Sequence, residues 1–124
     1  MGAGIGPGIR LRMDEASRQA EIDRALPQAI ERLRREFSPV AIYQFGSSVS
    51  GEAGSSSDLD LLVVLAESPE DFFHRGARAM RALRGVDVPI DVLVYTRSEF
   101  EASADRRMTF EHGVKRDGRV LYAA

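Results

Sequence analysis

The amino-acid sequence predicts an α/β domain of the α+β kind, in which helices flank a small mixed β-sheet. Two segments, 14–37 and 69–84, place apolar residues at helical spacing. Short runs rich in aliphatic and aromatic residues are typical of strands and cover 40–45, 59–65, 89–95 and 119–122. A chain of 124 residues forms one ordinary domain. Helical and extended segments alternate along it, which indicates helices packed on a sheet.

Composition narrows the class of protein. Hydrophobic residues make up 44% and charged residues 29%, which is typical of a globular chain, and no apolar run is long enough to cross a bilayer. We therefore expect a cytoplasmic protein. The absence of cysteine excludes a disulfide scaffold, thiolate zinc sites and thiol catalysis. Seventeen basic residues oppose nineteen acidic ones, a balance that weighs against a dedicated nucleic-acid binder.

The N-terminal residues are expected to lie outside the domain. Residues 1–13 contain four glycines and a proline and predict a flexible tail, so that the domain spans 14–124. Asp14 is expected to cap a long helix that ends at Pro39. Pro27 lies inside this pattern, and it either kinks the helix or begins a second one.

Helix 69–84 has two contrasting sides. Its inward side is expected to carry Phe72, Phe73, Ala77, Met80 and Leu83. The other side carries an arginine at every third position, namely Arg75, Arg78, Arg81 and Arg84. We expect these arginines to form a solvated face, and the alternative is a docking surface for an anionic partner.

Shorter elements complete the chain. A turn at 85–87 leads into the strand at 89–95, and residues 96–98 offer a cap for a short helix from Glu99. A further helix is expected at 105–115, before the final strand. His74 and His112 have no ligand-spaced partner and are expected to be surface or packing residues.

Three carboxylates lie within or beside aliphatic strands. Asp58 and Asp60 point to the same face because strand side chains alternate with period two. Asp91 lies between apolar neighbours on a later strand. If the two strands pair, the three acids come together, and their repulsion calls for a compensating cation. Hard oxygen ligands suit Mg²⁺, and such a cluster can hold two ions for in-line displacement at phosphorus.

A glycine-serine turn supplies the second part of the pattern. Gly46 lets the backbone approach a ligand closely, and Ser47 offers a hydroxyl at the start of a short helix, where N–H groups bind phosphate. Each element alone has an ordinary structural explanation, because Gly-Ser is common in loops and Asp91 could be a capped structural acid. Their order and placement on aliphatic strands favour the joint, catalytic interpretation.

The segment 29–122 resembles the minimal nucleotidyltransferase family, a branch of the DNA polymerase beta-like superfamily. That family carries a Gly-Ser, then Ser-Asp-x-Asp a dozen or so residues later, then a third Asp on a later strand. The matching residues here are Gly46, Ser47, Ser57, Asp58, Asp60 and Asp91. The closing stretch around residues 95–100 and 117–122 is also similar to the family's usual ending.

The resemblance implies transfer of a nucleoside monophosphate, with AMP from ATP the expected case, to a hydroxyl group. It implies Mg²⁺, expected as two ions, with Asp58, Asp60 and Asp91 as the metal ligands and catalytic residues. Gly46, Ser47 and Ser57 would bind the nucleotide. Small members are often antitoxins of a HEPN-type toxin and can adenylylate a tyrosine of it, so we expect a protein partner or a second copy of the chain.

The loop departs from the family's pattern at Ser48 and Ser50, where many small members carry arginines. Serine does not offset phosphate charge as arginine does. Arg97, Arg106 or Arg107 could substitute from elsewhere. The alternative function is therefore a catalytically weak or inactive binding module that neutralises its toxin by forming a complex.

Overall fold

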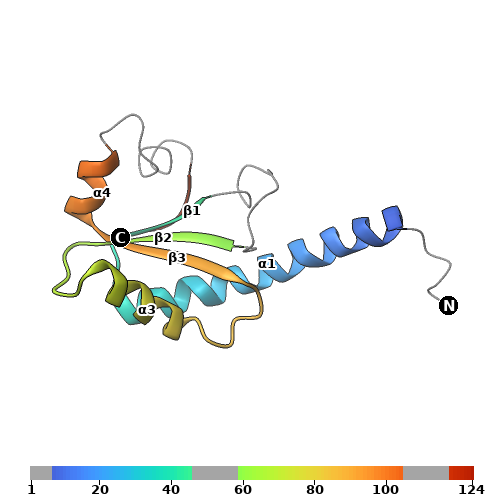
Figure 1. Cartoon of the computed structure of the whole chain (residues 1–124), viewed down its shortest axis with the longest axis horizontal. Helices are drawn as coiled ribbons and strands as arrows, with labels where there is room; N and C mark the ends of the chain where they lie inside the picture. Colours follow the sequence, from blue (N-terminus) through green and yellow to red (C-terminus); the bar gives the residue numbers. More distant parts are fainter. Residues whose placement is uncertain (1–6, 46–58, 105–117) are drawn as a thin grey trace.

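The computed structural model describes residues 7–45, 59–104 and 118–124, with side chains over 16–45, 59–102 and 118–124 (Figure 1). Its elements are α1 (Pro7–Phe37), β1 (Ala41–Phe45), β2 (Leu59–Leu65), α3 (Phe72–Ala82), β3 (Ile90–Thr96), α4 (Arg97–Ala104) and β4 (Arg119–Ala123). The architecture confirms the predicted α+β fold with a mixed sheet flanked by helices. The glycine-serine loop and the helix expected at 105–115 lie outside the described residues.

The four strands form one sheet in the order β3-β2-β1-β4. β1 runs antiparallel to both β2 and β4, whereas β2 and β3 are parallel. All seven residues of β2 are buried, which explains the nearly continuous aliphatic run that predicted this strand. The parallel pair needs a crossover, and α3 provides it between the two strands.

Helices cover both faces of the sheet. α1 and α3 lie together against one face (Figure 1), where Leu33, Ile42, Leu61, Val63 and Val94 form the centre of the main core. α4 covers part of the other face, where Phe100 packs with Leu62 and Val64. The ring of Phe100 also stacks on Tyr43 at 5.5 Å between centroids. Among the described helices, α4 packs on this second face.

Helix α1 is longer than the sequence pattern predicts. It begins at Pro7, so residues 7–13 are helical where a tail was expected. Proline is well suited to a first helical position, and Arg10, Leu11, Arg12 and Met13 have high helix propensity. Pro27 lies inside this helix, which continues to Phe37, so no second helix begins there. Among the described residues, no helix combines the length and apolar character that crossing a membrane requires.

Helix α3 is rotated relative to the prediction. The buried positions are Arg75, Ala79 and Leu83, whereas Phe73, Ala77 and Met80 are exposed. The expected inward side is therefore wrong at those three exposed residues. Asp71 caps the helix by accepting a hydrogen bond from the backbone N–H of His74 at 2.9 Å. His74 itself is exposed, as the sequence predicted.

The arginines of α3 do not form one solvated face. The Arg75 side chain is buried, and its guanidinium meets Glu99 of α4 through two hydrogen bonds of 2.8 and 2.9 Å. Arg78 is half-buried and pairs with Glu36 and Glu70. Those hydrogen bonds, with Glu36 the larger contributor, raise the pKa of Arg78 above its ordinary value. The prediction of a solvated face is therefore wrong for these two residues, because carboxylates distant in sequence neutralise them.

Candidate active site

Two of the three predicted carboxylates lie side by side at one end of the parallel strand pair. The register of β2 and β3 sets Asp60 opposite Asp91. Residues opposite each other in adjacent strands project from the same face of the sheet, so both carboxylates belong to the face that α4 partly covers. Asp60 is only 5% exposed, whereas Asp91 is open to solvent. The structure therefore brings these two acids together on neighbouring strands, as the sequence pattern predicted.

The last residue of β1 lies beside these two carboxylates. Phe45, its last residue, is the register partner of Asp60. β1 thus ends, and β2 begins, where the two carboxylates lie. The predicted nucleotide-binding residues Gly46, Ser47 and Ser57, and the third acid, Asp58, fall between these strand ends and lie outside the described residues.

The electrostatics of this end differ from those of an ordinary sheet face. Asp60 is a buried acid whose register partner in the next strand, Asp91, is a second acid. Two carboxylates in register can bind one divalent cation between them. Carboxylate oxygens are the hard ligands that Mg²⁺ prefers, so the chemistry of the two side chains fits that ion. Over residues 16–45, 59–102 and 118–124 no group of three potential ligand side chains gathers, and Asp58 lies outside those ranges.

A pocket of about 410 Å³ adjoins Asp91. It lies between the end of α3, the turn that follows it and the start of β3. Its walls are mostly apolar and comprise Met80, Leu83, Arg84, Gly85, Val86, Val88, Pro89, Ile90 and Asp91. Gly85 adopts a φ of +90°, a left-handed conformation that favours glycine, and so allows the tight turn at this wall. Asp91 therefore lies at the margin of a pocket whose other walls are mostly apolar.

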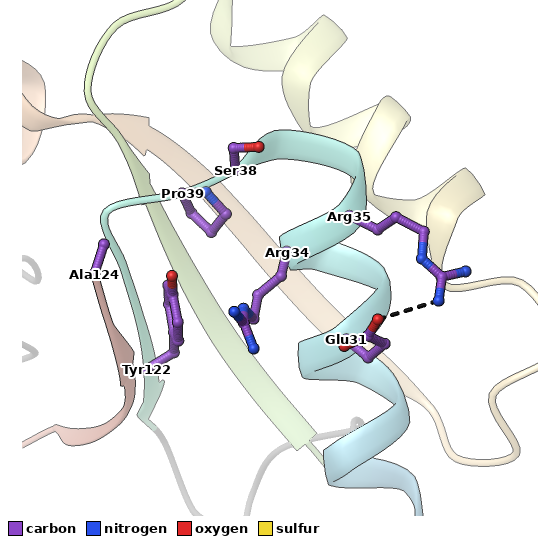
Figure 2. Close-up of a pocket in the computed structure, with 7 residues that line it drawn as sticks. All are labelled: Glu31, Arg34, Arg35, Ser38, Pro39, Tyr122 and Ala124. Atoms are coloured by element: carbon purple, nitrogen blue, oxygen red, sulfur yellow. Dashed lines mark hydrogen bonds and ion pairs between the residues drawn. The ribbon is translucent and has the colours of Figure 1, made fainter.

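A second pocket, of about 450 Å³, lies at the opposite end of the sheet (Figure 2). Ser38 and Pro39, which precede β1, line it together with Tyr122 of β4. The Arg34 guanidinium lies 4.4 Å from the centre of the Tyr122 ring, a favourable cation–π arrangement. Arg35 forms an ion pair with Glu31 beside it (Figure 2). Local sequence pattern does not reveal this pocket, because its walls come from segments 31–39 and 122–124, which are far apart along the chain.

A network of unlike charges fixes α4 at the far end of β3. Thr96 Oγ1 accepts from the Glu99 N–H at 3.3 Å, and Glu99 Oε1 accepts from the Thr96 N–H at 2.9 Å. This reciprocal capping box could have been found from its Thr-x-x-Glu spacing. Arg75 completes the network, and its hydrogen bonds are the main reason that the pKa of Glu99 lies below its ordinary value. Arg75 also donates to the backbone carbonyls of Glu70 and Val94.

The remaining predicted contributors are not brought to the carboxylates by any described contact. Arg97 is the first residue of α4 and is exposed. Arg106, Arg107, Ser48 and Ser50 lie outside the described residues. The described part of the site therefore consists of Asp60, Asp91 and the strand ends that hold them.

Comparison with known proteins assigns the family. The sequence profile of the nucleotidyltransferase domain matches residues 26–116, which is most of the chain. The protein belongs to this nucleotidyltransferase family. The matched segment includes both paired carboxylates, the glycine-serine loop and Asp58, and it leaves out β4 and the first half of α1.

Structural comparison agrees with this assignment at the level of the fold. The nucleotidyltransferase domain superposes on the crystal structure of a candidate nucleotidyltransferase from Sulfolobus solfataricus with a TM-score of 0.60. The two sequences are 20% identical, and the alignment covers 87% of this chain and 86% of the other. No curated protein matches the sequence.

Proposed function

We propose that this nucleotidyltransferase transfers AMP from ATP to a hydroxyl group of a protein partner, in a reaction that depends on Mg²⁺ and releases pyrophosphate. The observation that carries the proposal is the register pairing of Asp60 with Asp91 at the end of β2 and β3. A metal-assisted transfer requires carboxylates held close together, and the register of β2 and β3 provides such a pair.

The different exposure of the two acids supports different roles. Asp60 is buried and fixed in the central strand, so with Asp58 it is suited to hold the metal ions. Asp91 is exposed, so a macromolecular acceptor can reach it. Bound Mg²⁺ supplies charge neutralisation for the triphosphate and lowers the pKa of an attacking hydroxyl. Asp91 would be the third ligand and would orient that hydroxyl.

The proposed transfer forms one bond to the α-phosphorus and breaks another. The acceptor oxygen forms a bond to the α-phosphorus while the bond from that phosphorus to the bridging oxygen of the β-phosphate breaks. Pyrophosphate leaves, and the hydroxyl proton passes to solvent. Gly46, Ser47 and Ser57 are proposed to bind the phosphates through backbone N–H groups and hydroxyls.

We further propose a HEPN-type protein as the acceptor, in accordance with the resemblance to minimal nucleotidyltransferases. The alternative is a binding module that neutralises this partner without chemistry. Exposed arginines on α3 favoured that alternative, and two of the four are engaged within the chain, by Glu99 and by Glu36 and Glu70. The ion pairs of Arg75 and Arg78 remove part of the support for the binding module, whereas the serines at positions 48 and 50 still favour it.

The test uses ATP labelled at either the α- or the γ-phosphate, Mg²⁺ and the protein encoded by the adjacent gene. We expect the α-label to reach the partner, and we expect the γ-label to remain on pyrophosphate. Asp60→Asn and Asp91→Asn should abolish the transfer, whereas Asp87→Asn, which changes an exposed acid in the turn before β3, should not. Neutralisation of the partner by the Asp60→Asn variant without any label transfer from the wild type would instead establish the binding module.

A further inference from the structure

The outward flank of α3 carries apolar side chains that no other described part of the chain covers. Phe73 is 82% exposed and Met80 47%, and Ala77 is also exposed. These three residues recur at positions i, i+4 and i+7 and so form one line, which we call the α3 stripe. Single exposed apolar residues are ordinary, but a continuous line that contains an almost fully exposed phenylalanine indicates an interaction surface.

Charges of opposite sign flank the two ends of the α3 stripe. Asp71 is exposed at the beginning of the helix, where its carboxyl also lies 2.8 Å from His74 Nδ1, and the hydrogen bonds from the backbone N–H and then the side chain of His74 hold its pKa below the ordinary value. Arg81 and Arg84 are exposed at the other end, and neither forms an ion pair with a described side chain. A surface that is acidic at one end and basic at the other complements itself when a second copy is turned through a half circle.

The smallest residues of the helix lie midway between Phe73 and Met80. A Cβ atom built on Gly76 would meet no atom within 4 Å, so packing within the chain does not require glycine there. Glycine inside a helix is unfavourable relative to alanine. Gly76 and Ala77 together allow another helix backbone to approach closely at the centre of the stripe. Such an approach would explain why glycine occupies position 76.

We propose that a second copy of this chain binds the α3 stripe, with the two α3 helices antiparallel about a two-fold axis near Gly76 and Ala77. Phe73 of each copy then packs against Met80 of the other, because the two residues lie equally far from the axis. Asp71 of each copy lies near Arg81 and Arg84 of the other. The proposal goes beyond the transfer reaction and does not depend on it.

The outer edge of β3 lies on the same side of the molecule as the stripe. Among the described strands, β3 is paired only with β2. Met80 lines the same pocket as Ile90 and Asp91 at the start of β3. A second copy on the stripe would therefore also border the open strand edge, which otherwise invites non-specific pairing. It would place Phe73 of the second copy beside the pocket that adjoins the candidate active site.

The first test measures mass by analytical ultracentrifugation over micromolar concentrations. We expect the wild type to sediment at twice the 13.7 kDa mass of the chain. Phe73→Glu should weaken the dimer about thirtyfold or more, the effect of removing a central aromatic anchor. Because Phe73 makes little contact with the core, its thermal unfolding should change little. Val120→Glu, at a residue of β4 that is 57% exposed, is the matched control and should remain dimeric.

The second test uses the absence of cysteine from the chain. Ala77→Cys places a single thiol beside the proposed axis, so mild oxidation should give a disulfide-linked dimer rapidly. Val120→Cys should cross-link far more slowly. A monomeric wild type, a dimer that survives Phe73→Glu, or equal cross-linking of the two cysteine variants would each overturn the proposal, and the first result would leave the stripe to a different protein.

Discussion

The two ends of strand β3 differ in the charges of the side chains that meet there. At its start, Asp91 lies in register with the buried Asp60, so two like charges face the same side of the sheet. At its end, Glu99 accepts hydrogen bonds from Arg75 and caps α4. Folding favours the second arrangement, because unlike charges compensate each other's loss of hydration. The Arg75–Glu99 end of the strand stabilises the fold, and we propose that the Asp60–Asp91 end binds a ligand that supplies positive charge.

The largest expected effect comes from removing charge at the start of β3. Asp60→Asn and Asp91→Asn should each lower the rate of label transfer about 10²–10³-fold or more, the scale of losing one group that stabilises the transition state. The free energy of unfolding should change little in comparison, because asparagine keeps the size of the side chain and its capacity to accept hydrogen bonds. Transfer rates and urea unfolding curves measure the two effects. A variant that loses activity because it unfolds would contradict the division between the two ends.

Removing charge at the end of β3 should instead lower the stability of the fold. Glu99→Ala leaves the buried guanidinium of Arg75 without its carboxylate partner and should lower the free energy of unfolding by roughly 2–3 kcal/mol. The loss is below that of a fully buried pair, because Glu99 is partly exposed and two backbone carbonyls still accept from Arg75. Glu67→Ala, at an exposed acid between β2 and α3, is the control and should change stability by less than about 0.5 kcal/mol. Equal losses in both variants would show that the Arg75 network contributes nothing special.

The same end predicts a dependence of stability on pH. The pKa of Glu99 is lower in the folded chain than its ordinary value of 4.5, chiefly because of the hydrogen bonds from Arg75. The stabilisation is therefore complete above that ordinary value and is lost as the pH falls below it towards the folded pKa. The difference in unfolding free energy between the wild type and Glu99→Gln should shrink over this acid range. Urea titrations at a series of pH values measure it, and a difference that stays constant would refute the coupling.

A smaller effect is expected at the cap of α4. Thr96→Ala removes the side-chain acceptor for the Glu99 N–H and should cost about 1 kcal/mol of unfolding free energy. Thr96→Ser keeps the hydroxyl and is the matched control, which should lose less than half of that. If the serine variant is as unstable as the alanine variant, packing of the Thr96 methyl group, and not the cap, explains the loss.

The sequence was most informative where structure depends on local periodicity. The bounds of β2 match the prediction, because an aliphatic run at a strand's length admits few other structures. The pairing of Asp60 with Asp91 followed from placing each acid on an aliphatic strand and assuming that the strands are neighbours. Four of the six predicted site residues, Gly46, Ser47, Ser57 and Asp58, lie outside the described residues, and the catalytic roles of Asp60 and Asp91 remain predictions.

The face of α3 could not be predicted, because it depends on a distant residue. Phe73 and Met80 are the more hydrophobic choice for an inward face, and hydropathy selects them over Arg75. Arg75 is buried nonetheless, because Glu99, which lies 24 residues later, meets its guanidinium. A non-local ion pair of this kind leaves no trace in local periodicity. The reciprocal spacing of Thr96 and Glu99 was visible in the sequence, but the third member was not.

The central claim is that the paired carboxylates form a cation-dependent nucleotide site, and the midpoint of thermal unfolding tests it most directly. A ligand that binds only the folded state raises this midpoint in proportion to its occupancy. Millimolar Mg²⁺ with ATP should raise the midpoint of the wild type by several degrees and leave that of the Asp60→Asn/Asp91→Asn variant unchanged. An unchanged wild-type midpoint, or an equal rise in both proteins, would contradict the claim.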